Sequence, residues 1–305
     1  MPTPILFPLL PDGSEPLVER LEWLTDVQIA RDGSERRRPL RASPRLTLGA
    51  RFVLLRDDAE STLDPLRAGQ RLLVPFWMHQ AKQDASGQLF ADAGVQLNAD
   101  NPLLVRRSSG QLDTLTASVD VQGGVRGWTA DQPGGYSYSR DRAQAWPLVE
   151  GFLAEDSFDV EYMTPTARVT SLRFTALLHR EQPATWDGPR SSGLIVFPER
   201  IDWQTSPTEG VAHSVARFDA GHLWSQELRH TKRSVAVGLK LMSRQAVLDF
   251  RRWLYAVQGR AVPFRWQAPM DSSERIWRLA DDSIELNYIT PRIANTSLRF
   301  IEVPA

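Results

Sequence analysis

An internal repeat constrains the fold of this chain more than any other feature, because repeated segments predict copies of one structural unit. The segment ERLEWLT at residues 19–25 returns as ERIDWQT at residues 199–205, an offset of 180. Residues 153–174 return as 279–300, an offset of 126, and 12 of these 22 positions are identical. Both blocks occur in the same order in each half, which predicts a tandem duplication.

A third repeated block lies between these two and locates the insertions. LRASPR at 40–45 returns as LRHTKR at 228–233, an offset of 188, and the same offset carries VPF at 74–76 onto 262–264. The offset rises from 180 to 188 and then falls to 126. The second copy therefore gains eight residues before its middle block, and the first copy gains 62 residues after its own.

These offsets predict the domain organisation. We expect a first copy over residues 1–180, with the insertion at about 81–150. A run containing Pro, Gly and Ser at 181–193 is expected to link it to a second copy over 194–305. The insertion is long enough for a small β subdomain or a long hairpin.

Hydrophobic periodicity predicts the elements of each copy. Residues 235–241 alternate between apolar and other side chains, which is typical of a half-buried strand. A helix is expected after Ser243, which can cap it, with Gly259 as its end. The matching slot at 57–68 contains Pro65, so that helix should be shorter or broken. Several strands with one flanking helix per copy predict a β-rich α+β fold of two sandwich or barrel modules.

Aromatic residues that recur in both copies are the expected core of the repeated unit, because large apolar side chains dominate protein interiors. They are Trp23, Trp203, Phe76, Phe264, Tyr162, Tyr288, Phe174 and Phe300.

Nothing in the sequence indicates catalysis. The chain has no cysteine, its five histidines lack metal-binding spacing, and no GxSxG, GxGxxG or Walker loop is present. The acidic pairs Glu155–Asp156 and Asp281–Asp282 are interpreted as solvated turns. With 36 basic and 37 acidic residues, the composition argues against a general nucleic-acid binder. We expect no enzyme, no cofactor, no metal site and no membrane insertion.

Two clusters outside the repeats are candidate interaction surfaces. Arg36, Arg37 and Arg38 follow a turn, and we interpret them as a charged surface loop or a subunit interface, with phosphate binding as the alternative. Trp128, Tyr136 and Tyr138 lie in the insertion, where they can either pack together or form a flat surface for a sugar ring or a partner protein.

The opening of the chain resembles a known family. EWLTDV at 22–27, DGSERR at 32–37 and LRxxPR at 40–45 are similar to the distal tail or baseplate-hub proteins of long-tailed, siphovirus-type bacteriophages. The resemblance implies a tail-tube-like fold, in which sheets line a ring and helices pack outside. It also implies a structural protein of the virion tail tip, assembled in the cytoplasm of the host bacterium. Its expected neighbours are the tail tube, tape-measure and baseplate hub proteins, and genome DNA only passes through the channel.

The duplication adds an expectation about stoichiometry. Such rings contain six tube domains, so three chains with two copies each complete one ring, with pseudo-sixfold symmetry. A hexamer with six first copies in the ring is the alternative. The competing function is a carbohydrate-binding accessory module of the tail tip that uses the aromatic residues of the insertion. A peptidoglycan hydrolase is a weaker third hypothesis, because no nucleophile or metal cluster stands out.

Overall fold

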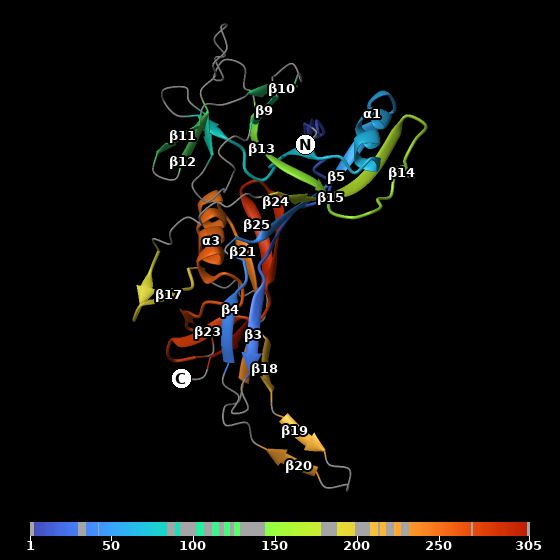
Figure 1. Ribbon diagram of the computed structural model, residues 1–305. Helices are drawn as coiled ribbons and strands as arrows, with labels where there is room; N and C mark the ends of the chain where they lie inside the picture. The colour runs from blue at the N-terminus through green and yellow to red at the C-terminus, as the bar shows by residue number, and fades with distance from the viewer. Residues whose placement is uncertain are drawn as a thin grey trace.

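The computed structural model describes most of the repeated parts of the chain. Its described residues are 3–29, 35–41, 43–83, 89–91, 102–106, 112–115, 119–122, 125–128, 144–177, 188–198, 208–212, 214–217, 223–226, 232–269 and 271–303. The protein is rich in β-strands, most of which belong to one large mixed sheet (Figure 1). The second ERIDWQT block, including Trp203, lies outside the described residues.

Among its described residues the first half contains one helix, α1 (Arg56–Arg67), which directly follows the longest strand of that half. Its main strands are β1 (Ile5–Leu6), β2 (Leu17–Glu22), β3 (Thr25–Ile29), β4 (Glu35–Pro39), β5 (Arg45–Leu55), β6 (Leu72–Pro75), β13 (Gln144–Leu153), β14 (Glu161–Tyr162) and β15 (Ala167–Ala176). The described residues between β6 and β13 form six short strands: β7 (Lys82–Gln83), β8 (Leu89–Ala91), β9 (Leu103–Arg106), β10 (Leu112–Leu115), β11 (Val119–Gln122) and β12 (Val125–Trp128).

The second half also has one helix among its described residues, α3 (Arg244–Val257). Its strands are β16 (Arg190–Ser191), β17 (Leu194–Val196), β18 (Thr208–Ala212), β19 (Ser214–Arg217), β20 (Leu223–Gln226), β21 (Lys232–Leu241), β22 (Phe264–Trp266), β23 (Arg275–Leu279), β24 (Ser283–Thr290) and β25 (Ile293–Glu302). The β-rich α+β class expected from the sequence is therefore present.

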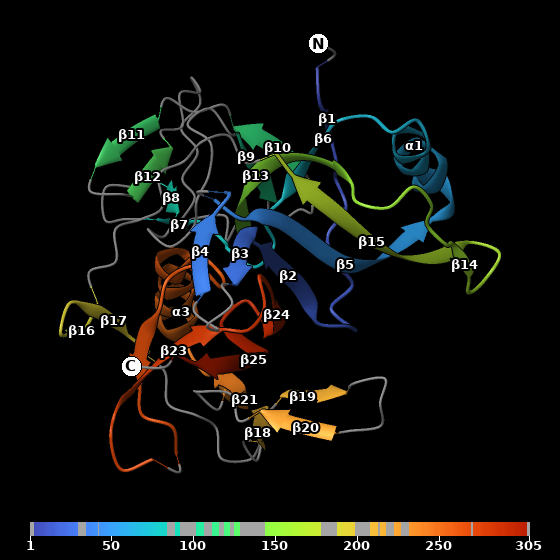
Figure 2. The ribbon, with the colours of Figure 1, turned by 60° about the horizontal axis from the view of Figure 1, so that its bottom comes forward.

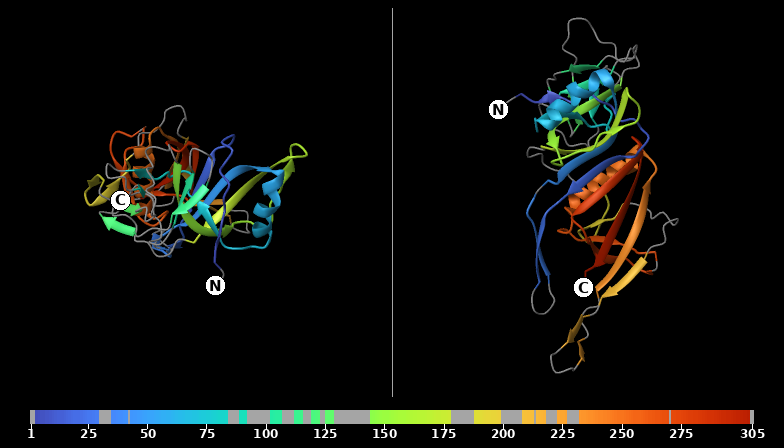
Figure 3. Two further views of the ribbon diagram at one scale, coloured as in Figure 1. Left: turned by 90° about the horizontal axis from the view of Figure 1, so that it is seen from above. Right: turned by 90° about the vertical axis from the view of Figure 1, so that its right-hand side faces the viewer.

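Strand β2 joins the two halves into one sheet. It pairs antiparallel with β5 of its own half, where Val18 lies opposite Gly49, and with β24 of the other half, where Leu17 lies opposite Tyr288. The central sheet thus runs β15–β5–β2–β24–β25–β21, with every neighbouring pair antiparallel. In Figure 3 the blue strands of the first half lie alongside the red and orange strands of the second.

The two halves use the same pairing scheme. In the first half, β15 pairs with β5 on one side and with β14 and β13 on the other. In the second half, β25 pairs with β21 on one side and with β24 and β23 on the other. A parallel pair completes each half, β1 with β6 and β17 with β22. The strands β1 and β17 begin a short repeat that the sequence analysis missed, ILFP at residues 5–8 and IVFP at 195–198.

The structure shifts the register of the middle repeat by one residue. Leu48 lies opposite Phe174, and Val235 lies opposite Phe300, so equivalent positions in β5 and β21 differ by 187 rather than 188. Side chains alternate between the two faces of a strand. An offset of 188 would therefore match the buried Leu48 with a residue on the opposite, more exposed face of β21. The two helices keep the offset of 188, because one extra residue precedes α3.

The repeated VPF tripeptide also occupies different positions. Val74 and Pro75 lie in β6, whereas Val262 and Pro263 precede β22. The partners in β13 and β23 align β6 with β22 at an offset of 192, so Phe76 and Phe264 are not equivalent.

The helix signals were mostly right. The side chain of Ser243 accepts a hydrogen bond from the backbone N–H of Ala246 at 3.1 Å, and α3 ends at Val257, before left-handed Gln258 and Gly259. Helix α1 has 12 residues against 14 in α3, so it is shorter, but it is not broken: Pro65 sits inside its last turn.

The insertion forms a separate small sheet, in the order β11–β12–β8–β7, at one end of the molecule (Figure 2). The hairpin β9–β10 extends the main sheet, because β9 pairs with the first residues of β13. The insertion ends before β13 rather than at about residue 150, since Leu148–Gly151 pair with β6 of the main sheet.

Most of the recurring aromatic residues lie in the core. Trp23, Phe76, Phe174, Phe264, Phe300 and Tyr288 are all buried. Phe7 packs against Phe52 and Phe174, with ring centroids 5.2 and 4.9 Å apart, and Phe197 packs against Phe300 at 5.4 Å. Tyr162 departs from the expectation: it is 68% exposed, because β14 is covered on only one side by a described strand.

The end of α3 gives a test of how tightly the halves meet. Gly259 has φ +63°, and a Cβ there would lie 2.5 Å from Asp282 Oδ1 and 2.9 Å from Trp23 Cβ. Gly69, which follows α1, has φ +61° but nothing within 4 Å of the same position. We expect Gly69→Ala to cost about 1 kcal/mol of backbone strain and Gly259→Ala about 2–4 kcal/mol, because the overpacking adds to it. Equilibrium urea unfolding measures both. Equal costs would mean that neither Asp282 nor Trp23 packs closely against Gly259.

Candidate functional site

One face of the central sheet is polar across both halves. Because strand side chains alternate, the residues opposite the apolar core form a single surface. Most of its members are charged, polar or small: Arg20, Glu22, Arg45, Thr47, Gly49, Ser171, Arg173, Thr175, Glu285, Asn295, Ser297 and Arg299. Val18, Val53, Leu55 and Ile289 lie on the same side and are apolar. We call this surface the polar face.

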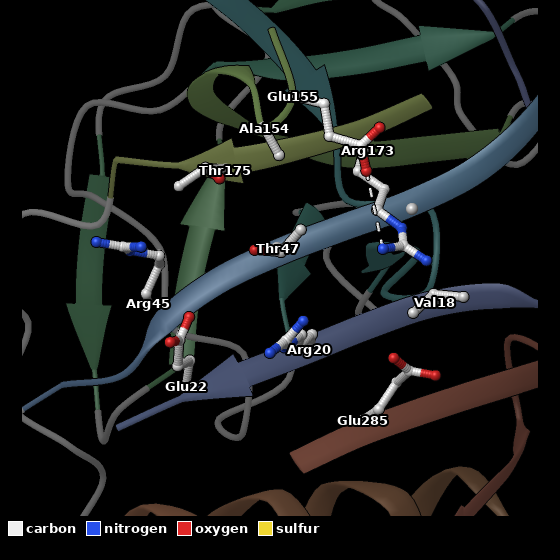
Figure 4. A pocket seen from close by; sticks show the side chains of 11 residues that line it. Val18, Arg20, Glu22, Arg45, Thr47, Ala154, Glu155, Arg173, Thr175 and Glu285 are labelled. Carbon is white, nitrogen blue, oxygen red and sulfur yellow. Dashed lines mark ion pairs between the residues drawn. The ribbon is translucent and has the colours of Figure 1, made fainter. Parts of the chain in front are cut away.

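A shallow hollow of about 210 Å³ lies on the polar face, where the two halves meet (Figure 4). Arg20 and Glu22 of β2 line it together with Arg45 of β5, Arg173 of β15 and Glu285 of β24. Arg173 lies 3.8 Å from the Glu155 carboxylate, and Arg20 donates a hydrogen bond to Ser283 Oγ at 2.7 Å. The surface therefore mixes both signs of charge.

Within the described part of the chain, no three histidine, aspartate or glutamate side chains come together as a metal site.

A buried polar cluster fastens β2 to the second half from the opposite side of the sheet. Arg251 of α3 donates to Glu19 Oε1 through Nε at 3.0 Å and through Nη2 at 2.7 Å. The Tyr288 hydroxyl of β24 donates to Glu19 Oε2 at 2.6 Å. His79 completes the cluster, with Nε2 at 3.6 Å from Glu19 Oε2 and 3.4 Å from the Tyr288 hydroxyl. All four side chains are buried.

The electrostatics of this cluster favour one charge state. Burial alone raises the pKa of Glu19, but Arg251, His79 and Tyr288 outweigh it and bring that pKa to about 2. Burial and the positive charge of Arg251 lower the pKa of His79 to about 4, with a smaller contribution from Arg244. Burial and the Glu19 carboxylate raise the pKa of Tyr288. At neutral pH the cluster therefore holds one buried ion pair with neutral His79 and Tyr288.

This cluster was not predicted from the sequence, although one signal for it is present. Arg251 lies among the apolar residues Val247, Phe250 and Leu254 on the buried side of α3. A charged residue in an apolar helix stripe needs a buried partner. That partner, Glu19, lies 232 residues away along the chain and could not be identified from spacing.

A second set of contacts, around Asp282, also crosses between the halves. Its carboxylate accepts hydrogen bonds from the Thr25 N–H at 2.9 Å, from the Thr25 hydroxyl at 2.8 Å and from the Arg260 N–H at 2.9 Å. Its carbonyl accepts from the Trp23 N–H at 2.8 Å. The interpretation of this acidic pair as a solvated turn is therefore wrong for Asp282, although Asp281 is exposed and pairs with Arg299.

The arginine-rich segment forms strand β4, paired with β3 in a hairpin. Arg37 points inward: its side chain is 7% exposed, pairs with Glu35, and donates to the Arg260 carbonyl at 3.2 Å. Arg36 and Arg38 are exposed on the other side of the strand. The segment is thus a strand rather than a loop, and it presents two of its three arginines to solvent.

The aromatic residues of the insertion are only partly described. Trp128 ends β12, where its backbone lies opposite Val119 and Leu89. Tyr136 and Tyr138 lie outside the described residues. A shared sugar-binding surface therefore stays a prediction.

Comparison with protein-family models and with curated proteins found no match. Among the described residues, no helix is long and apolar enough to cross a membrane.

The buried cluster makes stability depend on pH. The folded pKa values of His79 and Glu19 lie below their ordinary values of 6.5 and 4.5, so the unfolded chain binds more protons. The free energy of unfolding should therefore decrease as the pH is lowered. His79 should cause the decrease between about pH 6.5 and 4, and Glu19 between about pH 4.5 and 2. The expected slope is on the order of 1 kcal/mol per pH unit for each group. Urea unfolding between pH 7.5 and 4.5 measures the contribution of His79 to this pH dependence. His79→Gln should remove it, and an unchanged slope in that variant would contradict the assignment.

Proposed function

We propose that this chain is a structural, non-catalytic subunit of a phage tail tip, which forms a ring between the tail tube and the baseplate. In this proposal the polar face lines the channel, and the helices pack on the outer side of the sheet. The resemblance of residues 22–45 to distal tail proteins supports the class, and the shared pairing scheme of the two halves supports descent from one duplicated tail-tube-like module.

The observation that carries the proposal is the continuity of the polar face across β2. A channel that lets DNA pass must be hydrated, and it must not hold the phosphate backbone through a field of unpaired cations. The polar face meets both needs, because Arg20, Arg45 and Arg173 are interspersed with Glu22, Glu155 and Glu285. The opposite face of the sheet is apolar, and α1 and α3 cover it.

The ring stoichiometry follows from the two halves in each chain. Three chains supply six sheet-bearing halves, which matches a sixfold tail tube above and allows threefold symmetry below. Its neighbours in the virion would be the tail tube, tape-measure and baseplate hub proteins. A hexamer that places only the first halves in the ring is the competing arrangement.

Native mass spectrometry with electron microscopy of the purified protein tests this proposal. We expect closed rings of three 34.4 kDa chains. A gold label on Ser171→Cys of the polar face should appear inside the ring, and the same label on Asp64→Cys of α1 should appear outside, since both positions are exposed. Rings with the two labels exchanged would contradict the channel assignment, and a protein that stays monomeric with its tail partners would contradict the ring.

A further inference from the structure

The two halves differ at one edge of the sheet. In the second half, β24 pairs with β25 on one side and with β2 on the other. Its counterpart in the first half, β14, pairs with β15 in the same register but has no second partner among the described residues. No described strand therefore occupies, next to β14, the position that β2 occupies next to β24.

The residues in and just before β14 match those that β2 covers in the second half. Ile284, Leu286 and Tyr288 are 3%, 0% and 1% exposed beside β2. The residues 126 positions earlier are Phe158, Val160 and Tyr162, which keep the same apolar and aromatic pattern. Phe158 and Val160 are only half-buried, and Tyr162 is 68% exposed, next to Met163 at 59%. An unpaired edge with exposed large side chains is a surface that favours strand addition.

The second half carries a strand suited to this position. β18 pairs with β21 as β2 pairs with β5, with Thr208 opposite Ala236 and Val18 opposite Gly49. Among the described residues, β21 is the one partner of β18, so no described strand covers the edge equivalent to the β24-facing edge of β2. The pairing register makes Thr208 the counterpart of Val18 and Glu209 the counterpart of Glu19, an offset of 190. The sequence repeat had instead aligned Glu19 with Glu199, at an offset of 180.

We propose that β18 of one chain adds to the β14 edge of a second copy and repeats the β2–β24 junction between chains. The register carried over from that junction places Thr208 opposite Glu161 and Val211 opposite Phe158, in antiparallel orientation. In Figures 1 and 3, β14 and β18 lie at opposite ends of the molecule, so one chain cannot pair them with each other. The contact is therefore head-to-tail, and repetition of it produces a ring or an open filament.

The proposed ring would close through this pairing of β18 with β14. The claim that the pairing closes a ring rests on the proposed function. Each ring would then contain two alternating kinds of junction, β2–β24 within a chain and β18–β14 between chains. The strand pairing itself does not require closure, which separates the two proposals experimentally.

Disulfide trapping tests the register directly, because the chain has no cysteine of its own. Residues opposite each other in antiparallel strands have Cα atoms about 4.5–5.5 Å apart, within disulfide reach. The double variant Glu161→Cys/Thr208→Cys should give covalent dimers and larger species on non-reducing gels after mild oxidation. Val18→Cys/Asn287→Cys is the matched control, since these two residues are the counterparts within one chain and should crosslink without a change in mass.

A register control separates specific pairing from random oxidation. Glu161→Cys/Val211→Cys moves one cysteine three residues along the strand, about 10 Å away, and should crosslink at least tenfold less. A mixture of the two single variants Glu161→Cys and Thr208→Cys should give dimers of one chain of each kind. Equal crosslinking in the shifted pair, or no interchain product when the Val18–Asn287 control reacts fully, would overturn the proposal. Rings without this crosslink would refute the pairing alone, and crosslinked open filaments would refute the ring alone.

Discussion

The structure depends on the buried ion pair between Glu19 and Arg251. Removing two charges from water is costly, and the cost is offset only where the geometry is good and the remaining hydrogen-bonding atoms are satisfied. Here the guanidinium donates twice to one carboxylate oxygen, and Tyr288 donates to the other. Because Glu19 belongs to the first half and Arg251 to the second, neither half can complete its interior alone. We interpret the pair as the device that fixes the position of β2 on the second half.

The consequences of that placement reach both faces of the sheet. On the buried face, β2 covers Tyr288 and its neighbours, and Asp282 ties Thr25 and Arg260 together at the end of the same strand. On the opposite face, β2 brings Arg20 and Glu22 into line with the charged residues of β5 and β24. One continuous polar surface, rather than two separate ones, is what the proposed channel requires. Because β2 pairs with β24, β14 and β18 each have one edge that no described strand covers, at opposite ends of the molecule.

Sequence reasoning succeeded where the physical signal is local. The alternation in β21, the Ser243 cap and the end of α3 follow from side-chain periodicity and helix termini, and each was predicted. The strand register was not, because a shift of one residue between β5 and β21 leaves most residue identities plausible and is decided by which face is buried. The pairing of β2 with β24 joins residues more than 260 positions apart, and no local pattern encodes it.

The exposed Tyr162 shows another limit of reasoning from repeats. Tyr162 and Tyr288 lie in matching sequence contexts, which predicts matching burial. Their burial differs because it depends on the strand alongside: β2 covers Tyr288, and no described strand covers Tyr162. Likewise, Asp282 differs from its counterpart Asp156 because Thr25 and Arg260 reach it. Repeat equivalence therefore predicts the local fold, and the surroundings decide the role of each copy.

The most direct test of this account is the unfolding free energy of Glu19→Gln. The substitution keeps the shape of the side chain but leaves the buried Arg251 charge without its counter-ion, so we predict a loss of about 3–5 kcal/mol. Glu60→Gln is the matched control, because Glu60 pairs with Arg67 and Arg168 at the surface and should leave stability nearly unchanged. A Glu19→Gln protein as stable as the Glu60→Gln control would contradict the claim that this ion pair holds the two halves together.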